Sequence, residues 1–238
     1  MVQTISRRVF LVSTGGVLVA PRISWAAVEV LSLLDHILLG CNDLERGIAF
    51  VEERTGVRAA FGGVHPGRGT QNALLSLGER RYLEIIAPDP AQAESKNAMA
   101  VQLRNLLEPR LVGWAAHPGD LQAFAAKLRE ARVAFEGPTP GSRKRPDGKV
   151  LHWSTLDLQD SRDGLLPFFI EWSADSLHPS ADSPKGCSLV RFEAASSEPD
   201  ALAKQTALLG LDIPVVKGNK PQLRATIAGP KGQFSVTS

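Results

Sequence analysis

The chain contains the same order of predicted elements twice, and this duplication limits the fold more than any other feature of the sequence. Asp43-Leu44 and Asp120-Leu121 each open a segment in which apolar residues recur at helical spacing, and the two openings lie 77 residues apart. Aspartate is a favourable helix N-cap, so both segments are predicted to be helices. A strand-like segment precedes each helix and further strand candidates follow it. The sequence therefore predicts two β-α-β-β-β modules.

Two such modules must share a core, because one module alone cannot bury the face of its sheet. We place module one at about residues 31–90 and module two at about 110–175, with a helix predicted between them. A third, partial copy covers about residues 186–238 and has no acidic residue in its last strand. We expect it to be structural and to cover a sheet edge or extend a pocket wall. The predicted fold class is α+β.

Each of the two full modules ends in an apolar strand that carries a glutamate. Glu84 lies between Leu83 and Ile85, and Glu171 follows 87 residues later between Ile170 and Trp172. A carboxylate among large apolar side chains loses hydration, which costs several kcal/mol unless a cation or hydrogen-bond donors replace the water. Two such residues at matching places favour a shared pocket with a positive occupant. The alternative is a salt bridge at a strand end to a nearby arginine.

Five short stretches follow one another in a characteristic order. They are Leu34-Asp35-His36-Ile37, Gly69 to Leu74, Tyr82 to Asp89, Arg145 to Gly148, and Leu166 to Trp172 followed by His178-Pro179. In this order they resemble the vicinal oxygen chelate superfamily, and its glyoxalase-like branch most closely. The resemblance covers nearly all of the chain from Leu33 onward. It implies paired β-α-β-β-β modules that form a curled mixed sheet around a pocket, with the third partial module at the C-terminus.

The resemblance also implies a metal site, because the superfamily takes its ligands from the first and last strands of each module. His36, Glu84 and Glu171 are the expected ligands of a divalent metal ion, and Glu171 is also the expected catalytic base. The fourth position lies 77 residues after His36 and is Gly113, so this ligand set is incomplete. A core histidine held by hydrogen bonds is the competing interpretation of His36.

Other residues complete the expected site. His117, His152 or a water molecule are candidates for the missing ligand, and sequence spacing does not choose among them. The expected substrate-binding residues are Arg143, Arg145, Trp114 and Phe169. Arginine suits an anionic group on a ligand, and aromatic side chains suit a pocket wall.

Two classes of function remain open. The first is a metal-dependent lyase or isomerase of glyoxalase-like type that acts on a small substrate with adjacent oxygens. The second is a protein that binds or sequesters a small molecule without any metal, like the bleomycin-resistance proteins of the superfamily. The incomplete ligand set favours the second class, and the paired glutamates favour the first. A ring-cleaving dioxygenase is disfavoured, because it needs two histidines and one carboxylate.

The first 26 residues are predicted to be an export signal. Ser6-Arg7-Arg8-Val9-Phe10-Leu11 matches the twin-arginine pattern, and small residues in Ser24-Trp25-Ala26 suit signal peptidase. The apolar segment from Val9 to Ala20 is shorter than the about 20 residues that a membrane span needs. We therefore expect residues 27–238 to form a periplasmic or secreted protein, which meets the twin-arginine export machinery and has no membrane anchor after cleavage.

The net charge argues against nucleic acid as a partner. The whole chain has a formal charge of +2, and the predicted signal holds three arginines and no acid, so the mature charge is −1. A small-molecule ligand or substrate is the expected partner. The sequence leaves the oligomeric state open, a homodimer included. It also does not decide whether Cys41 and Cys187 form a bridge or remain free thiols.

Overall fold

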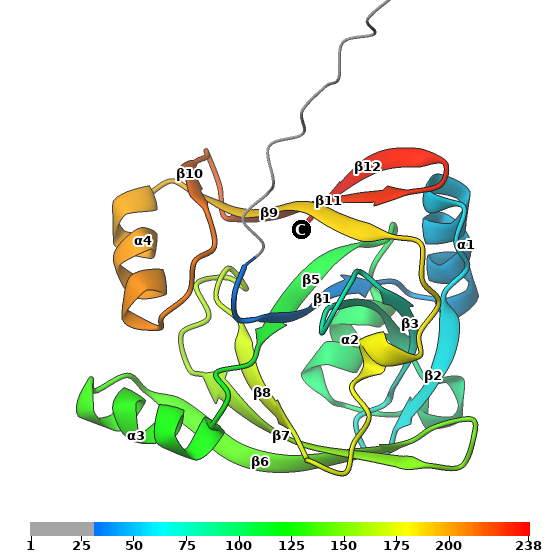
Figure 1. Cartoon of the computed structure of the whole chain (residues 1–238), viewed down its shortest axis with the longest axis horizontal. Helices are drawn as coiled ribbons and strands as arrows, with labels where there is room; N and C mark the ends of the chain where they lie inside the picture. Colours follow the sequence, from blue (N-terminus) through cyan, green and yellow to red (C-terminus); the bar gives the residue numbers. More distant parts are fainter. Residues whose placement is uncertain (1–30) are drawn as a thin grey trace, which may run out of the picture.

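A computed structural model describes residues 31–238 (Figure 1). The predicted signal peptide and its cleavage site lie outside the described residues. Among the described helices, none combines the length and the apolar character that crossing a membrane would require.

The described chain contains the two predicted modules in full. Module one comprises β1 (Leu34–Gly40), α1 (Leu44–Thr55), β2 (Ala60–His65), β3 (Thr70–Ser76) and β4 (Tyr82–Pro88). Module two comprises β5 (Arg110–Ala116), α3 (Leu121–Glu130), β6 (Phe135–Lys144), β7 (Val150–Leu158) and β8 (Phe168–Trp172). A short 3-10 helix η1 (Pro90–Gln92) and α2 (Ala98–Arg104) connect them. The predicted β-α-β-β-β duplication is therefore confirmed.

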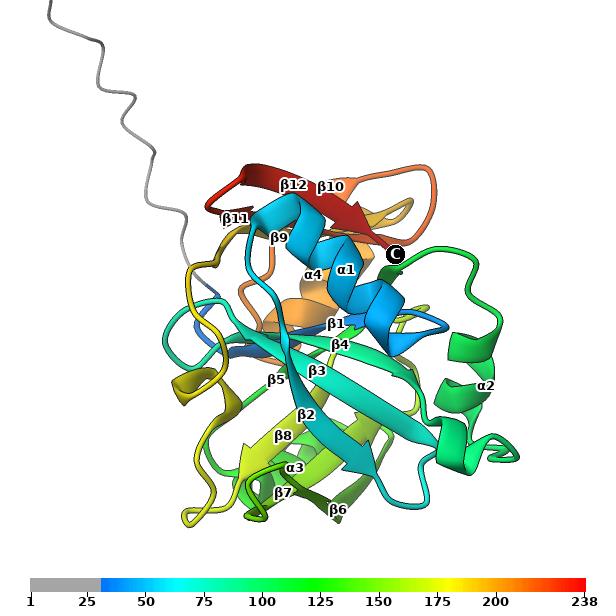
Figure 2. The same ribbon diagram turned by 90° about the vertical axis from the view of Figure 1, so that its right-hand side faces the viewer.

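The eight strands of the two modules form one sheet in the order β2-β3-β4-β1-β5-β8-β7-β6. β1 and β5 pair antiparallel at its centre, and the strands of each module follow in the same order on either side. A pseudo-twofold axis therefore relates the modules. The sheet curls so strongly that its two edge strands, β2 and β6, contact each other (Figure 2). The curled mixed sheet that the resemblance implied is confirmed, and its concave face encloses the space where the site lies.

Both helices of the modules begin at the predicted N-cap aspartates. The side chain of Asp43 accepts a hydrogen bond from the Arg46 amide, and Asp120 accepts one from the Ala123 amide, each at 2.8 Å. These bonds satisfy amides that lack a partner within the helix. Gly56 ends α1 with a φ of 80°, a conformation that glycine adopts without strain.

The third unit has the same order of elements but a different sheet. It follows the short 3-10 helix η2 (Pro179–Ala181) and comprises β9 (Ser188–Ser196), α4 (Pro199–Leu208), β10 (Val215–Lys217), β11 (Gln222–Gly229) and β12 (Gly232–Thr237). Its strand order is β10-β9-β11-β12, so the first strand lies between the second and third. In the modules, the first strand instead pairs with the last one.

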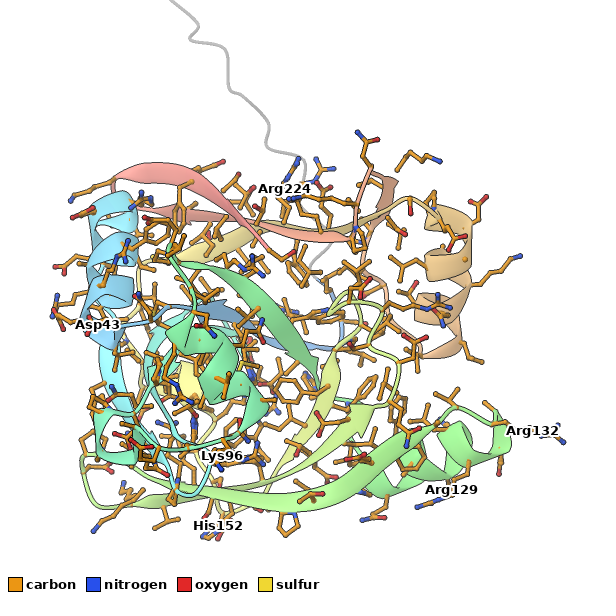
Figure 3. All side chains as sticks on the ribbon, turned by 180° about the vertical axis from the view of Figure 1, so that it is seen from behind. Asp43, Lys96, Arg129, Arg132, His152 and Arg224 are labelled. Atoms are coloured by element: carbon orange, nitrogen blue, oxygen red, sulfur yellow. The ribbon has the colours of Figure 1, made fainter. Side chains whose placement is uncertain are left out.

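This small sheet packs against α1 and β5 on the convex side of the large sheet. Phe192 of β9 packs edge-to-face on Trp114 of β5, with ring centroids 5.4 Å apart. Viewed from behind, Arg224 projects from the outer face of the small sheet, while Arg129 and Arg132 project from the end of α3 (Figure 3). The unit is thus a cover for the back of β5. This corrects the expectation that it caps a sheet edge or extends the pocket wall.

Both cysteines are buried and free. Cys41 packs in the core beside α1, where burial raises the pKa of its thiol to about 12. The structure therefore favours the interpretation of two buried thiols over a bridge.

Candidate functional site

A cavity of about 260 Å³ lies on the concave face of the large sheet, between the two modules and α2. Its wall combines eight aromatic or apolar side chains with ten charged or polar ones. The lining residues are His36, Leu38, His65, Arg68, Thr70, Asn72, Tyr82, Glu84, Ile86, Asn97, Met99, Arg143, Trp153, Thr155, Asp157, Phe168, Ile170 and Trp172.

A β-bulge at the start of β1 shapes the inner end of this cavity. Leu34 pairs with Ala116 and His36 pairs with Ala115, so Asp35 is an extra residue in the ladder. A bulge changes the direction of side chains, and here two neighbouring side chains meet. Asp35 Oδ1 lies 2.7 Å from Nδ1 of His36.

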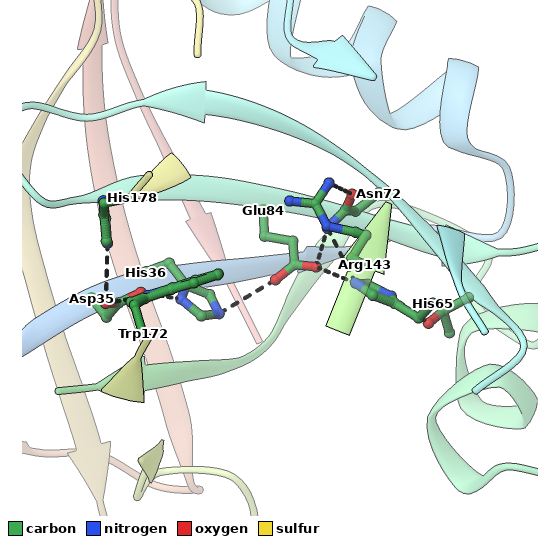
Figure 4. Close-up of polar contacts among 9 residues, drawn as sticks. Asp35, His36, His65, Asn72, Glu84, Arg143, Trp172 and His178 are labelled. Atoms are coloured by element: carbon green, nitrogen blue, oxygen red, sulfur yellow. Dashed lines mark hydrogen bonds and ion pairs between the residues drawn. The ribbon is translucent and has the colours of Figure 1, made fainter. Parts of the chain in front are cut away.

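The Asp35 carboxylate is fully buried and holds residues from three parts of the chain. Its Oδ2 atom accepts a hydrogen bond from Trp172 Nε1 at 3.1 Å and lies 3.2 Å from His178 Nε2 (Figure 4). Trp172 belongs to β8, and His178 precedes η2. Asp35 therefore connects the first strand of module one to the last strand of module two and to the segment after it.

A second polar chain continues from His36 across the cavity (Figure 4). His36 Nε2 lies 3.3 Å from Glu84 Oε2, but the two groups are not aligned for a hydrogen bond, and Nε2 has no such partner among residues 31–238. Glu84 Oε1 accepts a hydrogen bond from Asn72 Nδ2 at 2.7 Å. Asn72 Oδ1 accepts one from Arg143 Nη1 at 3.1 Å.

These contacts fix the charges of the site. Burial would lower the pKa of His36, but the carboxylates of Asp35 and Glu84 outweigh it and raise that pKa to about 9. Burial would raise the pKa of Glu84, but the His36 imidazolium and the Asn72 amide lower it to about 2. The pKa of Asp35 is likewise well below its usual range, since the hydrogen bonds from His178 and His36 outweigh burial. At neutral pH, an imidazolium therefore lies between two carboxylates.

His65 differs from His36 because burial dominates its environment. Burial lowers the pKa of His65 to about 4, although the Glu84 carboxylate 3.8 Å away acts in the opposite direction. His65 is thus a neutral ring at the cavity wall.

Glu171 lies outside this network. Phe168, Ile170 and Trp172 line the cavity, and the alternation of side chains along β8 turns Glu171 to the opposite face. There its Oε2 atom accepts a hydrogen bond from the amide of Leu121, the first residue of α3, at 2.8 Å. The structure brings His36 and Glu84 together but not Glu171, so the expected cluster of three ligands does not form.

The register of the central strands locates the counterpart of His36. His36 pairs with Ala115, and Leu38 pairs with Gly113. The pseudo-twofold axis maps one of these pairs onto the other. Gly113 is therefore the counterpart of His36, and Ala115 is the counterpart of Leu38. The 77-residue offset found in the sequence is therefore the true structural offset at this strand.

The same register explains the position of Glu171. Leu38 pairs with Glu84 in β4, and its counterpart Ala115 pairs with Phe168 in β8. Phe168 is thus the structural counterpart of Glu84. Glu171 lies three residues further along β8, and an odd shift places a strand residue on the other face.

Of the four expected substrate-binding residues, Arg143 alone lines the cavity. Arg145 lies outside it and forms ion pairs with Asp147 and Asp182. Trp114 is in the core, where its Nε1 atom donates to the carbonyl of Leu165 at 3.0 Å. Phe169 packs on Phe124 of α3, with ring centroids 4.3 Å apart. Both aromatic residues face away from the cavity, because each belongs to the convex side of its strand.

The side chains present do not fit the divalent metal site that the resemblance implied. Within residues 31–238, no group of three or more His, Cys, Asp or Glu side chains is placed to hold a metal ion. The second module supplies Gly113 and Phe168 at the places of His36 and Glu84. The two remaining candidates for a fourth ligand, His117 and His152, do not line the cavity.

Sequence reasoning missed part of the site. Asp35 and Asn72 are central to the network, and the role of Trp172 in holding Asp35 was not foreseen. An aspartate inside the apolar strand Leu34 to Leu39 was the available signal, since its buried carboxylate needs donors just as the glutamates do.

Comparisons with known proteins give a family and a fold. Residues 34–210 match the family model described as glyoxalase-like domain. A hypothetical protein from Staphylococcus aureus has a similar structure, with 19% identity, a TM-score of 0.61, and coverage of 87% of this chain and 85% of that chain. Curated proteins give no significant match.

Two methylmalonyl-CoA epimerases are also similar over part of the chain. The one from Mycobacterium tuberculosis has 19% identity and a TM-score of 0.43, and covers 62% of this chain and 91% of its own. The one from Streptomyces coelicolor has 22% identity and a TM-score of 0.45, with 62% and 99% covered.

Proposed function

Because the chain belongs to the glyoxalase-like domain family, we propose that it binds a small organic molecule in the concave cavity without a metal ion. The observation that carries this proposal is the pairing of His36 with Glu84. His36 lies 2.7 Å from Asp35 and 3.3 Å from Glu84, so both carboxylates already have a protein partner, and a space of about 260 Å³ lies beside them. A concave cavity that combines aromatic and apolar walls with placed polar groups is the usual form of a small-molecule site.

A metal-dependent lyase or isomerase is the second candidate. One observation favours it: Asp35 holds Nδ1 of His36, and outer carboxylates hold metal-bound histidines in the same way. The incomplete donor set argues against it. Thermal unfolding with organic compounds and with metal salts distinguishes the two functions.

Thermal unfolding of the purified protein tests the proposed function. We expect members of a set of small organic acids, amines and neutral compounds to raise the melting temperature, because a ligand that binds only the folded state stabilises it. Met99→Trp, which fills part of the cavity from α2, should remove this effect. Val101→Trp is the matched control, since Val101 lies on the same helix but does not line the cavity.

Melting temperatures measured with divalent metal salts test the lyase or isomerase function. Manganese, cobalt, nickel and zinc should not raise the melting temperature of the wild type. If one of them does, and Glu84→Gln abolishes the effect while Glu171→Gln keeps it, the lyase or isomerase is favoured. Glu171→Gln controls for the loss of one carboxylate, because Glu171 lies outside the cavity and accepts a hydrogen bond from the Leu121 amide.

We also propose that the protein is exported through the twin-arginine pathway to the periplasm or beyond. The support is the Arg7-Arg8 pattern and the Ser24-Trp25-Ala26 site. Replacing Arg7→Lys together with Arg8→Lys should leave the precursor in the cytoplasm. Cell fractionation and intact mass measure this, with a mature N-terminus expected at Ala27. Unchanged export of the double variant would refute the pathway.

A further inference from the structure

The charges that face the cavity are unequally compensated. Both oxygens of Glu84 have partners, since His36 lies beside one and Asn72 donates to the other. Arg143 is 3% exposed, and its one hydrogen bond among residues 31–238 goes to the neutral Asn72 amide. No carboxylate of the described chain forms an ion pair with it. Asp35, His36, Glu84 and Arg143 together carry no net charge, but Arg143 keeps N–H groups without a hydrogen-bond partner in the described chain, so it is the charged group left free for a ligand.

The other charged lining residues do not alter this balance. Arg68 and Asp157 are exposed and carry opposite charges. Burial lowers the pKa of Arg143, and the Glu84 carboxylate raises it. An arginine side chain nevertheless stays protonated in proteins. A buried, charged guanidinium with unused N–H groups is costly unless a partner of opposite charge joins it.

The fold makes room for this guanidinium at the junction of the two sheet edges. A Cβ atom on Gly62 would lie 2.4 Å from Arg143 Nη1 and 2.4 Å from Asn72 Oδ1. Gly63 has a φ of 138°, and a Cβ atom there would lie 2.5 Å from the carbonyl of Lys144. Two consecutive glycines in β2 thus let the arginine of β6 reach across into the cavity.

Flat aromatic side chains line the same cavity as Arg143. Trp153 and Trp172 lie with ring centroids 5.4 Å apart, and Tyr82 stacks on His36 at 4.5 Å. Phe168 meets His36 edge-on at 5.5 Å. Such walls favour a planar ligand, because aromatic rings pack best face to face with an offset or edge to face.

We propose that the cavity selects a small planar monocarboxylate, an aromatic acid of the benzoate type. Its carboxylate would pair with Arg143, and its ring would lie among the aromatic walls. A guanidinium matches a carboxylate with two parallel hydrogen bonds. Amines have no free carboxylate to bind at the inner end, since Glu84 is already compensated. This inference rests on the proposed function, because it names the ligand class of the same cavity.

Three matched probes test the ligand class by calorimetry: benzoate, benzamide and benzylamine. They share the ring and differ in charge. Benzoate should bind at least about tenfold more tightly than the other two, since a charge-assisted pair is stronger than a neutral hydrogen bond. Arg143→Met should weaken benzoate binding to the level of benzamide and leave benzamide unchanged. Arg145→Met is the control and should keep benzoate affinity, because Arg145 lies outside the cavity.

Gly62→Ala provides a second variant that retains the charge of Arg143. The added methyl group occupies the place of the guanidinium and should also weaken benzoate binding, so a folding failure of Arg143→Met leaves the proposal testable. Equal affinity for all three probes, or none for any, would overturn the ligand class. The proposed function would still stand if other compounds protect the wild type but not Met99→Trp. If no compound raises the melting temperature of the wild type, both the proposed function and the proposed ligand class fail.

Discussion

Asp35→Asn should lower the free energy of unfolding by about 3–5 kcal/mol, which is the usual consequence of removing one partner from a buried charged cluster. Asp35 is 0% exposed, and its two oxygens face His36, Trp172 and His178. An asparagine has one acceptor oxygen in place of two, and its NH₂ group would point at a donor. Urea unfolding at neutral pH measures the change.

Asp182→Asn is the matched control for this variant. Asp182 also pairs with a cation, Arg145, but its side chain is 36% exposed. Exposed pairs contribute about 0–1 kcal/mol, so the control should unfold close to the wild type. A loss for Asp35→Asn no larger than that of Asp182→Asn would show that the three donors do not depend on the carboxylate.

The fold could be predicted because its signals are local. Asp43 and Asp120 begin their helices within three residues of the amides they cap, so each signal is complete in a short stretch of sequence. Repetition of the same pattern then gives the modules. The third unit shows where this reasoning ends. Its elements follow the same order along the chain, but element order does not determine which strands pair, and β9 lies between β10 and β11.

The site could be predicted only in part, because it depends on register and on distant contacts. The predicted pairing of Glu84 with Glu171 failed because the two residues differ in register: Phe168 takes the place of Glu84 in β8, and Glu171 lies three residues further along, on the other face. Counting along the chain therefore does not transfer the face of Glu84 to module two.

The other part of the site could not be predicted because its contacts join residues that are far apart in the sequence. The donors that hold Asp35 lie 137 and 143 residues away at Trp172 and His178. Arg143 reaches Asn72 across 71 residues, and only the curl of the sheet brings the two edges together. A single sequence records that Asp35 needs donors, but the closure of the sheet decides which residues supply them.

The cavity groups should make the free energy of unfolding greatest near pH 6.5, and it should decrease at both higher and lower pH. The titratable and charged side chains around His36 are Asp35 on β1, His65 on β2, Tyr82 and Glu84 on β4, Arg143 on β6, and His178 beside η2. The alkaline side depends on His36. Its pKa is about 9 in the fold against an ordinary value of 6.5, so the folded state binds the proton more tightly.

That contribution is fully present below pH 6.5 and is lost as the pH rises to about 9. The acid side has three sources, and the first is Asp35, whose lowered pKa makes its contribution disappear only at the lowest pH. His65 has a pKa of about 4 in the fold against 6.5, so its protonation favours the unfolded state as the pH falls through this range. Glu84, with about 2 against 4.5, stabilises the fold above pH 4.5 and loses its contribution below that.

Urea unfolding between pH 3 and pH 10 measures this profile. His36→Gln should be less stable than the wild type at pH 6.5 and should remove most of the decline between pH 6.5 and 9, which is on the order of 3 kcal/mol for a shift of this size. His65→Gln should instead reduce the decline between pH 6.5 and 4. His152→Gln, at an exposed position on β7, should leave both sides unchanged. An alkaline decline that survives in His36→Gln would show that His36 is not the protonated centre of the cavity, and the pairing with Glu84 would then need another cation.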